Sequence, residues 1–350
     1  MLAAVVLALW PASAAAVELK GGDILVADVD AGAFGSVLGA IIRVDPSSGA
    51  QTPVSAGGSF INPFGVALEA DGSILVADDT ANAVFRVDPA TGAQTTVSSG
   101  GLLENPFDVA VEADGDILVA DRALIRVDPV SGAQTTVSSP GGLGLALEAD
   151  GDILVASGSV RRVDPTSGAQ TTVSGGSPID VAVEADGDIL ISELGTGVIR
   201  VDPSTGAQTI VSSGGLFEAP LGLAVEADGD ILVVDRHASG PSAVVRLDPV
   251  SGAQTTVSSG GSFVFPWGLA VVPAECDDGR DNDSDGRVDF PADPGCSSAS
   301  DDDERDEAPA FPTSKEQCRN GGWRRFGFKN QGQCVAFVER GPSSGERLTN

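Results

Sequence analysis

The decapeptide EADGDILVAD, residues 112–121, returns four more times in slightly altered form along this 350-residue chain. The other copies are EADGSILVAD (69–78), EADGDILVAS (148–157), EADGDILISE (184–193) and EADGDILVVD (226–235). A second phrase contains an Asp-Pro pair and occurs six times, at Asp45, Asp88, Asp128, Asp164, Asp202 and Asp248. The separations of 43, 40, 36, 38 and 46 residues match the roughly 40-residue period of propeller blades. The sequence therefore predicts six repeated units.

Each unit contains four runs of strand length. The runs G-L-A-V-E and D-I-L-V-A are joined by an Asp-Gly turn, which indicates a hairpin. A third run such as A-L-I-R-V leads into the Asp-Pro turn, and A-Q-T-T-V-S returns as the fourth. Four antiparallel strands in each of six units predict an all-β fold, a six-bladed β-propeller.

The ends of the repeat region suggest how the ring closes. The first unit begins directly at GGDILVAD, residues 21–28, without an inner strand of its own. An unpartnered WGLAVVP, residues 267–273, follows the sixth unit. We expect this C-terminal strand to complete the first blade and so close the propeller over residues 21–273, which leaves no open sheet edge there.

The repeated motif resembles a known family. The pattern P-x-G-[VL]-A-[VL]-E-A-D-G-D-I-L-V-A-D is similar to NHL repeats over residues 21–273. This resemblance implies a six-bladed propeller related to the gluconolactonase and senescence-marker proteins and to the streptogramin lyases. The same fold serves both binding proteins and enzymes, so the function has to be argued from the site.

The far end of each decapeptide is expected to lie at the mouth of the central channel, beside the start of each inner strand. The acidic residues of these two columns, which we take as candidate ligands at the channel mouth, are Asp28, Asp78, Asp108, Asp121, Asp180, Glu193 and Asp235. Carboxylates that converge on one axis cannot all stay ionised without a cation. The alternative is that each aspartate caps its own loop.

Other recurring residues suggest structural roles. One arginine recurs in each unit, and we expect salt bridges between blades, with the repeated glutamate as the partner: Arg43, Arg86, Arg126, Arg162, Arg200 and Arg246. The single histidine, His237, lies in a longer loop away from the inner-strand column. No catalytic residue is assigned.

Two function classes follow from the fold. The first is a secreted binding or scaffold module whose partner is an extracellular protein, a glycan or a small molecule. The alternative is a metal-dependent lactonase of the gluconolactonase type, or an enzyme like the streptogramin lyases, acting at the channel mouth. The net charge of −30 disfavours nucleic acid as a partner. We expect a monomer.

The termini indicate export. Residues 1–16, MLAAVVLALWPASAAA, form an apolar run that ends in small residues, as in a signal peptide. The run is too short to span a membrane, and no other segment approaches that length. The sequence therefore predicts a secreted protein, extracellular or associated with the cell envelope.

All four cysteines lie beyond the propeller, at Cys276, Cys296, Cys318 and Cys334. Three disulfide connectivities are possible. We favour two local bridges, Cys276–Cys296 and Cys318–Cys334, because each would close a segment too small to hold a hydrophobic core.

The segment 274–298 has the pattern of a calcium loop. Asp281, Asp283 and Asp285 alternate, Gly286 permits a sharp turn, and Asp289 follows. The remaining ligands are expected to be the Arg287 carbonyl and Asp293 or water, and Ala292 stands where an EF-hand has its bidentate glutamate. The segment resembles the thrombospondin type 3 repeats, which implies calcium as the cofactor. The alternative is a solvated acidic linker.

Two further segments complete the chain. Residues 299–313 are acidic and proline-containing, which predicts a disordered linker. Residues 314–341 form a cysteine-paired module with aromatic and basic residues, and it resembles a tail found on exported actinobacterial proteins. Two interpretations of this module remain open. Its aromatic and basic residues contact a glycan or envelope polymer, or they form a miniature core around one disulfide.

Overall fold

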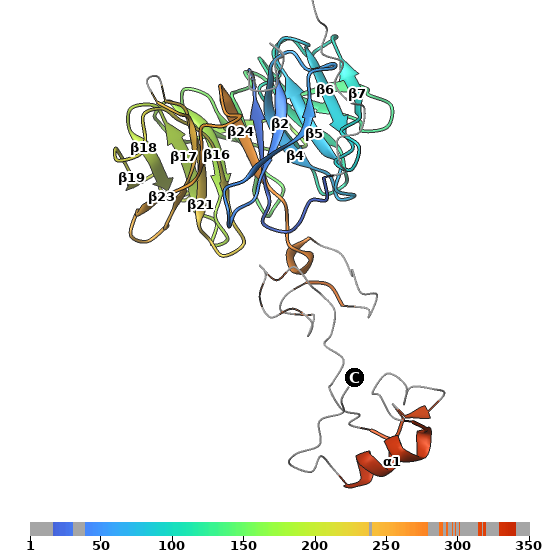
Figure 1. Cartoon of the computed structure of the whole chain (residues 1–350). Helices are drawn as coiled ribbons and strands as arrows, with labels where there is room; N and C mark the ends of the chain where they lie inside the picture. The colour runs from blue at the N-terminus through green and yellow to red at the C-terminus, as the bar shows by residue number, and fades with distance from the viewer. Residues whose placement is uncertain are drawn as a thin grey trace, which may run out of the picture.

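The computed structural model describes residues 17–30, 39–237, 240–278, 287–289, 292, 296, 298, 301, 314–316, 318–319 and 329–340. Residues 17–273 contain six four-stranded antiparallel sheets arranged as blades around an axis (Figure 1). Each inner strand contacts the inner strands of the two neighbouring blades. The protein is therefore a six-bladed β-propeller, as the sequence predicts.

The strands are given from the innermost to the outermost of each blade. Blade 1 contains β24 (Pro266–Val271), β1 (Ile24–Asp28), β2 (Ala40–Val44) and β3 (Gln51–Ala56). Blade 2 contains β4 (Pro63–Leu68), β5 (Ile74–Asp78), β6 (Ala83–Val87) and β7 (Gln94–Ser99). Blade 3 contains β8 (Asp108–Val111), β9 (Ile117–Ala120), β10 (Leu124–Val127) and β11 (Gln134–Ser138).

The other three blades follow the same order. Blade 4 contains β12 (Gly144–Leu147), β13 (Ile153–Ala156), β14 (Val160–Val163) and β15 (Gln170–Ser174). Blade 5 contains β16 (Pro178–Val183), β17 (Ile189–Glu193), β18 (Gly197–Val201) and β19 (Gln208–Ser212). Blade 6 contains β20 (Pro220–Val225), β21 (Ile231–Asp235), β22 (Ala243–Leu247) and β23 (Gln254–Ser259).

The ring closes as the sequence predicts. Strand β24, from the end of the propeller, pairs antiparallel with β1, from its beginning, with Val271 opposite Ile24 and Leu269 opposite Val26. In Figure 1 the orange β24 lies beside the blue strands of the first blade. The first blade therefore joins both ends of the repeat region, and the ring cannot form without residues 266–271.

The hydrophobic core is divided among the interfaces between blades. In β5, Ile74 and Val76 pack toward blade 1, whereas Leu75 and Ala77 pack toward blade 3. Side chains alternate along a strand, so a strand with a blade on each side must be apolar at every position. This explains the repeated I-L-V-A. Replacing a fully buried leucine such as Leu75 by alanine is expected to cost about 2–5 kcal/mol.

A hydrogen-bonded clasp joins the outer strands of neighbouring blades. The Gln134 amide nitrogen donates to Ser98 Oγ at 2.8 Å and to the Gly100 carbonyl at 2.9 Å. Ser98 Oγ in turn donates to the Gly132 carbonyl at 2.8 Å. The glutamine-to-serine bond recurs at all six interfaces, including the closing one, where Gln51 donates to Ser258. The repeated A-Q-T-x-V-S run thus connects each blade to the preceding one.

The repeated arginines pair with the expected glutamates, but within a blade. Arg126 on β10 forms a two-pronged ion pair with Glu112, which follows β8 of the same blade. The same pairing occurs in blades 2, 4, 5 and 6, and in blade 1 Arg43 pairs with Asp23. The prediction of salt bridges between blades was therefore wrong. The link to the next blade is instead a guanidinium bond to a proline carbonyl, as from Arg126 to Pro165 at 3.4 Å.

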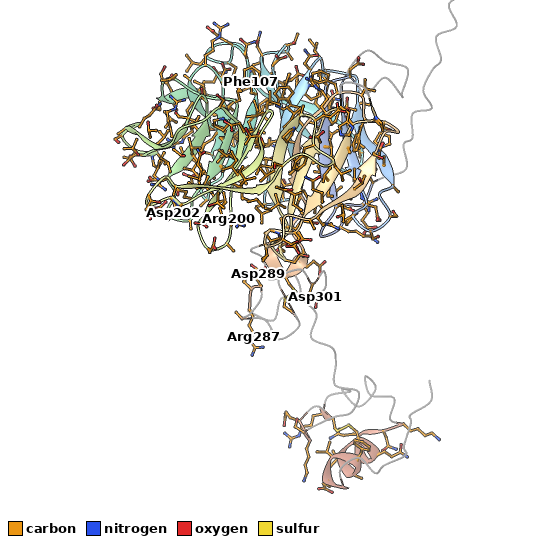
Figure 2. The ribbon with its side chains drawn as sticks, turned by 90° about the vertical axis from the view of Figure 1, so that its left-hand side faces the viewer. Phe107, Arg200, Asp202, Arg287, Asp289 and Asp301 are labelled. Carbon is orange, nitrogen blue, oxygen red and sulfur yellow. A yellow bond between two sulfur atoms is a disulfide. The ribbon has the colours of Figure 1, made fainter. Side chains whose placement is uncertain are left out.

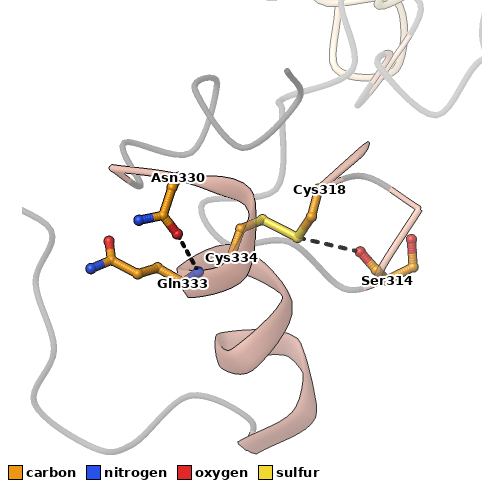
Figure 3. The surroundings of a disulfide bond; sticks show 5 residues. All are labelled: Ser314, Cys318, Asn330, Gln333 and Cys334. Carbon is orange, nitrogen blue, oxygen red and sulfur yellow. Dashed lines mark hydrogen bonds between the residues drawn. A yellow bond between two sulfur atoms is a disulfide. The ribbon is translucent and has the colours of Figure 1, made fainter. Parts of the chain in front are cut away.

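The C-terminal region contains two disulfides and little helix. Cys276 is bonded to Cys296 and Cys318 to Cys334, which are the two local pairs favoured by the sequence. A 3-10 helix, η2 (Glu275–Asp277), follows the last propeller strand. Helix α1 (Gln331–Arg340), which the sequence analysis did not assign, contains Cys334, and the Asn330 side chain accepts the Gln333 N–H at its start (Figure 3).

Several predicted segments lie outside the described residues. These are the signal peptide 1–16, all of the linker 299–313 except Asp301, and much of the module 314–341. Their assignments stay predictions. Within the part of the chain that the structure describes, no helix has the length and apolar character needed to cross a membrane.

Candidate binding site at the channel mouth

The two faces of the propeller are built from different kinds of loop. The short Asp-Gly and Asp-Pro turns lie on one face, and the loops that lead into the inner strands lie on the other. Figure 2 shows Phe107, at an inner-strand entrance, and Asp202, in an Asp-Pro turn, on opposite sides of the propeller. We call the side with Phe107 the channel-mouth face, and the side with Asp202 the turn face.

Carboxylates at the ends of the second strands bind the loops of the channel-mouth face. Asp78, which is fully buried, accepts N–H bonds from Ile61 at 2.7 Å and from Asn62 at 3.0 Å. The other four sequence candidates in this column also accept bonds from the loop of their own blade: Asp28, Asp121, Glu193 and Asp235. These are the hydrogen bonds of a loop cap, and they fix the approach to each inner strand.

Burial affects two of these carboxylates further. It raises the pKa of Asp28 and of Asp235, although backbone N–H bonds oppose the shift in both cases. Asp235 Oδ1 lies 2.9 Å from His237 Nε2, which is also 3.0 Å from the Leu216 carbonyl. Through these two contacts His237 joins its own loop to the one before β20.

These five carboxylates do not gather around one point. Among the residues that the structure describes, none of them belongs to a group of three or more side chains close enough to share a metal ion. The role of these five residues as ligands therefore stays a prediction: Asp28, Asp78, Asp121, Glu193 and Asp235. The remaining two candidates, Asp108 and Asp180, have a different environment.

Asp108 and Asp180 lie in the central channel. Asp108 Oδ1 accepts the N–H of Val109, the next residue, and Oδ2 accepts the Leu145 N–H of the next blade at 2.9 Å. Asp180 Oδ1 accepts the Val181 N–H, and Oδ2 accepts the Leu223 N–H of blade 6 at 2.9 Å. Each carboxylate thus bonds to the inner strand of the next blade, and both lie against β12, Asp108 at Leu145 and Asp180 at Gly144.

Glycines make room for this pair. A Cβ at Gly65 would lie 2.6 Å from Asp108 Oδ1, and a Cβ at Gly144 would overlap Asp180 Oδ1. A side chain at either glycine would therefore displace the carboxylate that lies against it. The inner-strand column alternates aspartate and glycine at positions 65, 108, 144 and 180 because each aspartate occupies the space beside its neighbouring glycine.

The environment of the pair disfavours ionisation. Burial raises the pKa of Asp180 to about 6. Burial, and then the nearby charge of Asp180, raise the pKa of Asp108 well above its usual range. No lysine, arginine or histidine among the described residues forms an ion pair with either carboxylate. We call these two residues the channel pair.

Aromatic side chains from three neighbouring blades lie along one side of the mouth. The Phe64 ring contacts Phe107 edge to face at 5.5 Å between centroids, and it contacts Trp267 in the same way at 4.6 Å. Trp267 stacks with Phe265, and the Arg236 guanidinium lies 4.3 Å from the centre of the Phe265 ring. Phe107 and Trp267 directly precede the inner-strand positions 108 and 268, so this rim adjoins the channel pair.

Exposed apolar side chains lie around the same face. Five large ones come from its loops: Ile61, Leu102, Leu194, Leu216 and Val264. Their exposed fractions range from 37% for Leu216 to 51% for Leu194. Single exposed apolar residues are ordinary on protein surfaces, but several on the loops of one face are typical of an interaction site. Together with the aromatic rings, they form what we call the mouth rim.

The turn face contains acidic groups that the sequence analysis treated only as turns. In blades 3 to 6 the repeated Glu-Ala-Asp-Gly-Asp brings three carboxylates within 4.8 Å of one another, as in Glu112, Asp114 and Asp116. Such a group could hold a metal ion. The glutamate of each group already binds an arginine, which partly neutralises the cluster.

The predicted calcium loop is only partly described. Asp281, Asp283, Asp285 and Asp293 lie outside the described residues. Asp289 adopts a left-handed backbone, with φ of 53°, and its Oδ1 accepts the Asp278 N–H at 3.1 Å. Arg287 is exposed. The calcium ligands of this loop therefore stay predictions.

Comparison with solved structures identifies the fold class. The chain is similar to one from a crystal structure of a nidogen/laminin complex, with a TM-score of 0.59 and 13% identity over 71% of this chain and 97% of that one. It is also similar to virginiamycin B lyase from Staphylococcus aureus, with a TM-score of 0.44 and 16% identity over 56% of this chain and 69% of that one. No protein-family model and no curated protein matches the chain. These identities are low, so the likeness shows the β-propeller fold alone.

Proposed function

We propose that the protein is a secreted binding module that uses its channel-mouth face to contact an extracellular partner. The mouth rim is the observation that supports this function most directly. Exposed apolar side chains and aromatic rings come from the loops and inner-strand entrances of that face, whereas the carboxylates of the turn face are paired or hydrogen bonded. The propeller supplies a rigid frame, because the rim loops before β4, β8, β20 and β24 are each held by a buried carboxylate.

The C-terminal region adds to this proposal. Strand β24 ends the propeller at Val271, and η2 and the Cys276–Cys296 bridge follow directly. In Figure 2 the labelled residues Arg287 and Asp289 of this segment, and Asp301 just after it, lie on the side of the turn face. Calcium bound to the segment 274–298 would stiffen this connection and leave the channel-mouth face open to a partner.

The lactonase or lyase alternative has less support. The channel offers only two carboxylates, and a third acidic, cysteine or histidine side chain is not close to them among the described residues. His237 is bound to Asp235 and to the Leu216 carbonyl, at a blade 6 loop. This alternative stays a prediction.

Site-specific crosslinking tests the proposed function. A photoreactive phenylalanine analogue is placed at Leu102 or Leu216 in the rim, and at Val130 or Val250 on the turn face. The two valines are each 95% exposed, so they are fully accessible controls. We expect discrete crosslinked products with extracellular and envelope material of the source organism from the rim positions only. Equal products from both faces would contradict the proposal.

A further inference from the structure

The channel pair has no internal cation. Its four oxygen atoms each accept one backbone N–H, and the guanidinium groups of the propeller are engaged elsewhere with Glu or Asp side chains, backbone carbonyls or the Phe265 ring. Buried charges in proteins are ordinarily paired. Like the fully buried Asp28 and Asp78, Asp108 and Asp180 have no ion pair among the described residues, but these two influence each other and are only half-buried, so a compensating charge can come from outside the fold.

Resting on the proposed function, we propose that the channel-mouth face binds its partner through the primary ammonium group of a lysine side chain. The ammonium group enters the channel and is held by Asp108 and Asp180. The apolar residues beside that lysine pack on the mouth rim. The partner is therefore a protein or peptide segment with an exposed lysine between apolar side chains.

The number of available acceptors fits an ammonium group. A carboxylate oxygen can accept two hydrogen bonds, and each oxygen of the channel pair uses one on a backbone N–H. An ammonium group presents three donors that can turn toward these remaining sites. A calcium ion would need about six to eight oxygen ligands, and only two acidic side chains meet here.

The charge also fits a single positive group. Burial raises the pKa of both carboxyls, and the charge of Asp180 raises the pKa of Asp108 further, so the pair resists carrying two full negative charges. A single ammonium group suits such a pair.

The mouth rim suits the rest of a lysine residue. A lysine stem has four methylene groups, and it packs on apolar surface while its charge lies elsewhere. Phe107 and Trp267, both half-buried, stand at the entrance beside the channel pair. Aromatic faces also attract a passing ammonium group. Apolar neighbours of the lysine would then contact exposed rim residues such as Leu102 and Val264.

Peptide titration of the full chain tests this inference. The probe is acetyl-Gly-Leu-Lys-Leu-Gly-amide, and its control carries an acetylated lysine, which has the same stem but no charge. Calorimetry and NMR should show the lysine peptide binding at least about tenfold more tightly, because charge-assisted bonds to a desolvated carboxylate are among the stronger ones. The affinity should fall as the pH drops below about 6, where the pair becomes protonated.

Matched variants locate the effect. The double variant Asp108→Asn, Asp180→Asn should bind the two peptides equally, whereas Asp114→Asn, Asp150→Asn on the turn face should keep the tenfold preference. The Phe107→Ala variant should weaken both peptides. Circular dichroism confirms that each variant is folded.

Three outcomes would overturn the inference, and they are distinguishable. If both peptides bind equally to the wild-type protein and Phe107→Ala weakens both, the face is a binding surface but the ammonium is not recognised. If neither peptide binds and the rim positions give no specific crosslinks, the proposed function fails as well. Displacement of the lysine peptide by millimolar calcium through the same two aspartates would identify a metal site instead.

Discussion

The turn face and the channel-mouth face come from the same repeat but treat their charges differently. On the turn face each repeated glutamate binds an arginine, and loop N–H and hydroxyl bonds lower the pKa of Asp-Pro residues such as Asp128 and Asp202. On the channel-mouth face, Asp108 and Asp180 have no ion pair among the described residues and their pKa values are raised. The repeated residues stabilise the ring, and the departures from the repeat form the candidate site.

Deleting β24 should have the largest effect, because it removes a strand that reaches both faces. Without residues 266–271, β1 keeps β2 but loses its inner partner strand, and the contacts of β24 with β20 and β4 are lost. We expect the deletion to abolish cooperative unfolding. The loss in the free energy of unfolding is then the whole stability of a domain, typically about 5–15 kcal/mol. Thermal unfolding followed by circular dichroism measures it. A chain that ends at Ala274 is the control and should unfold as the full chain does.

A pair of arginine substitutions sharpens the comparison of the faces. Arg126→Ala on the turn face leaves Glu112 unpaired at 14% exposure, and we expect a loss of about 3 kcal/mol in the free energy of unfolding. Arg122→Ala on the channel-mouth face removes an exposed ion pair with Glu104, whose side chains are 72% and 56% exposed. The expected loss is below about 1 kcal/mol. Urea unfolding measures both, and equal losses would contradict the assignment of stability to the turn face.

The channel pair should make stability depend on pH. The pKa of Asp180 is raised in the folded state, so its contribution to stability is complete below its usual pKa and is lost as the pH rises through about 6. Between about pH 4 and pH 8 the wild-type protein should lose about 2 kcal/mol relative to Asp108→Asn, Asp180→Asn. The channel is partly open, which limits the size of the effect. If the free energy of unfolding depends on pH in the same way in both proteins, the ionised pair does not destabilise the fold.

Calcium should have the smallest effect on the propeller. If Asp281, Asp283, Asp285 and Asp289 bind the ion as predicted, millimolar calcium should protect the segment 274–298 of the full chain from proteolysis. The melting temperature of the propeller should stay within about 1 °C, because the segment lies beyond β24. Asp283→Ala should abolish the protection. Cleavage at the same rate with calcium and with a chelator would identify an acidic linker.

The repeat alone determined the fold. A period near 40 residues, an apolar run buried on both sides and turn residues at fixed offsets are local signals, and each recurs often enough to be unambiguous. The orphan strand at 267–273 also predicted the closure, because an unpaired strand at one end and a missing strand at the other allow only one simple pairing. The two disulfides followed from short separations along the chain.

Only the tertiary structure decided what the acidic residues do. The sequence places Asp78 and Asp108 in one group of candidates, yet Asp78 accepts bonds from the loop of its own blade whereas Asp108 accepts the Leu145 N–H of the next blade. The sequence identified glutamate as the partner of Arg126, but it predicted the ion pair between two blades, whereas the pair lies within one blade. The composition of a strand is set by which sides of it are buried, and that can be read from its residue pattern. The partner of a charged side chain depends on which blade its atoms reach in three dimensions. Because a repeat presents the same residues at every blade, the sequence alone does not show which blade that is.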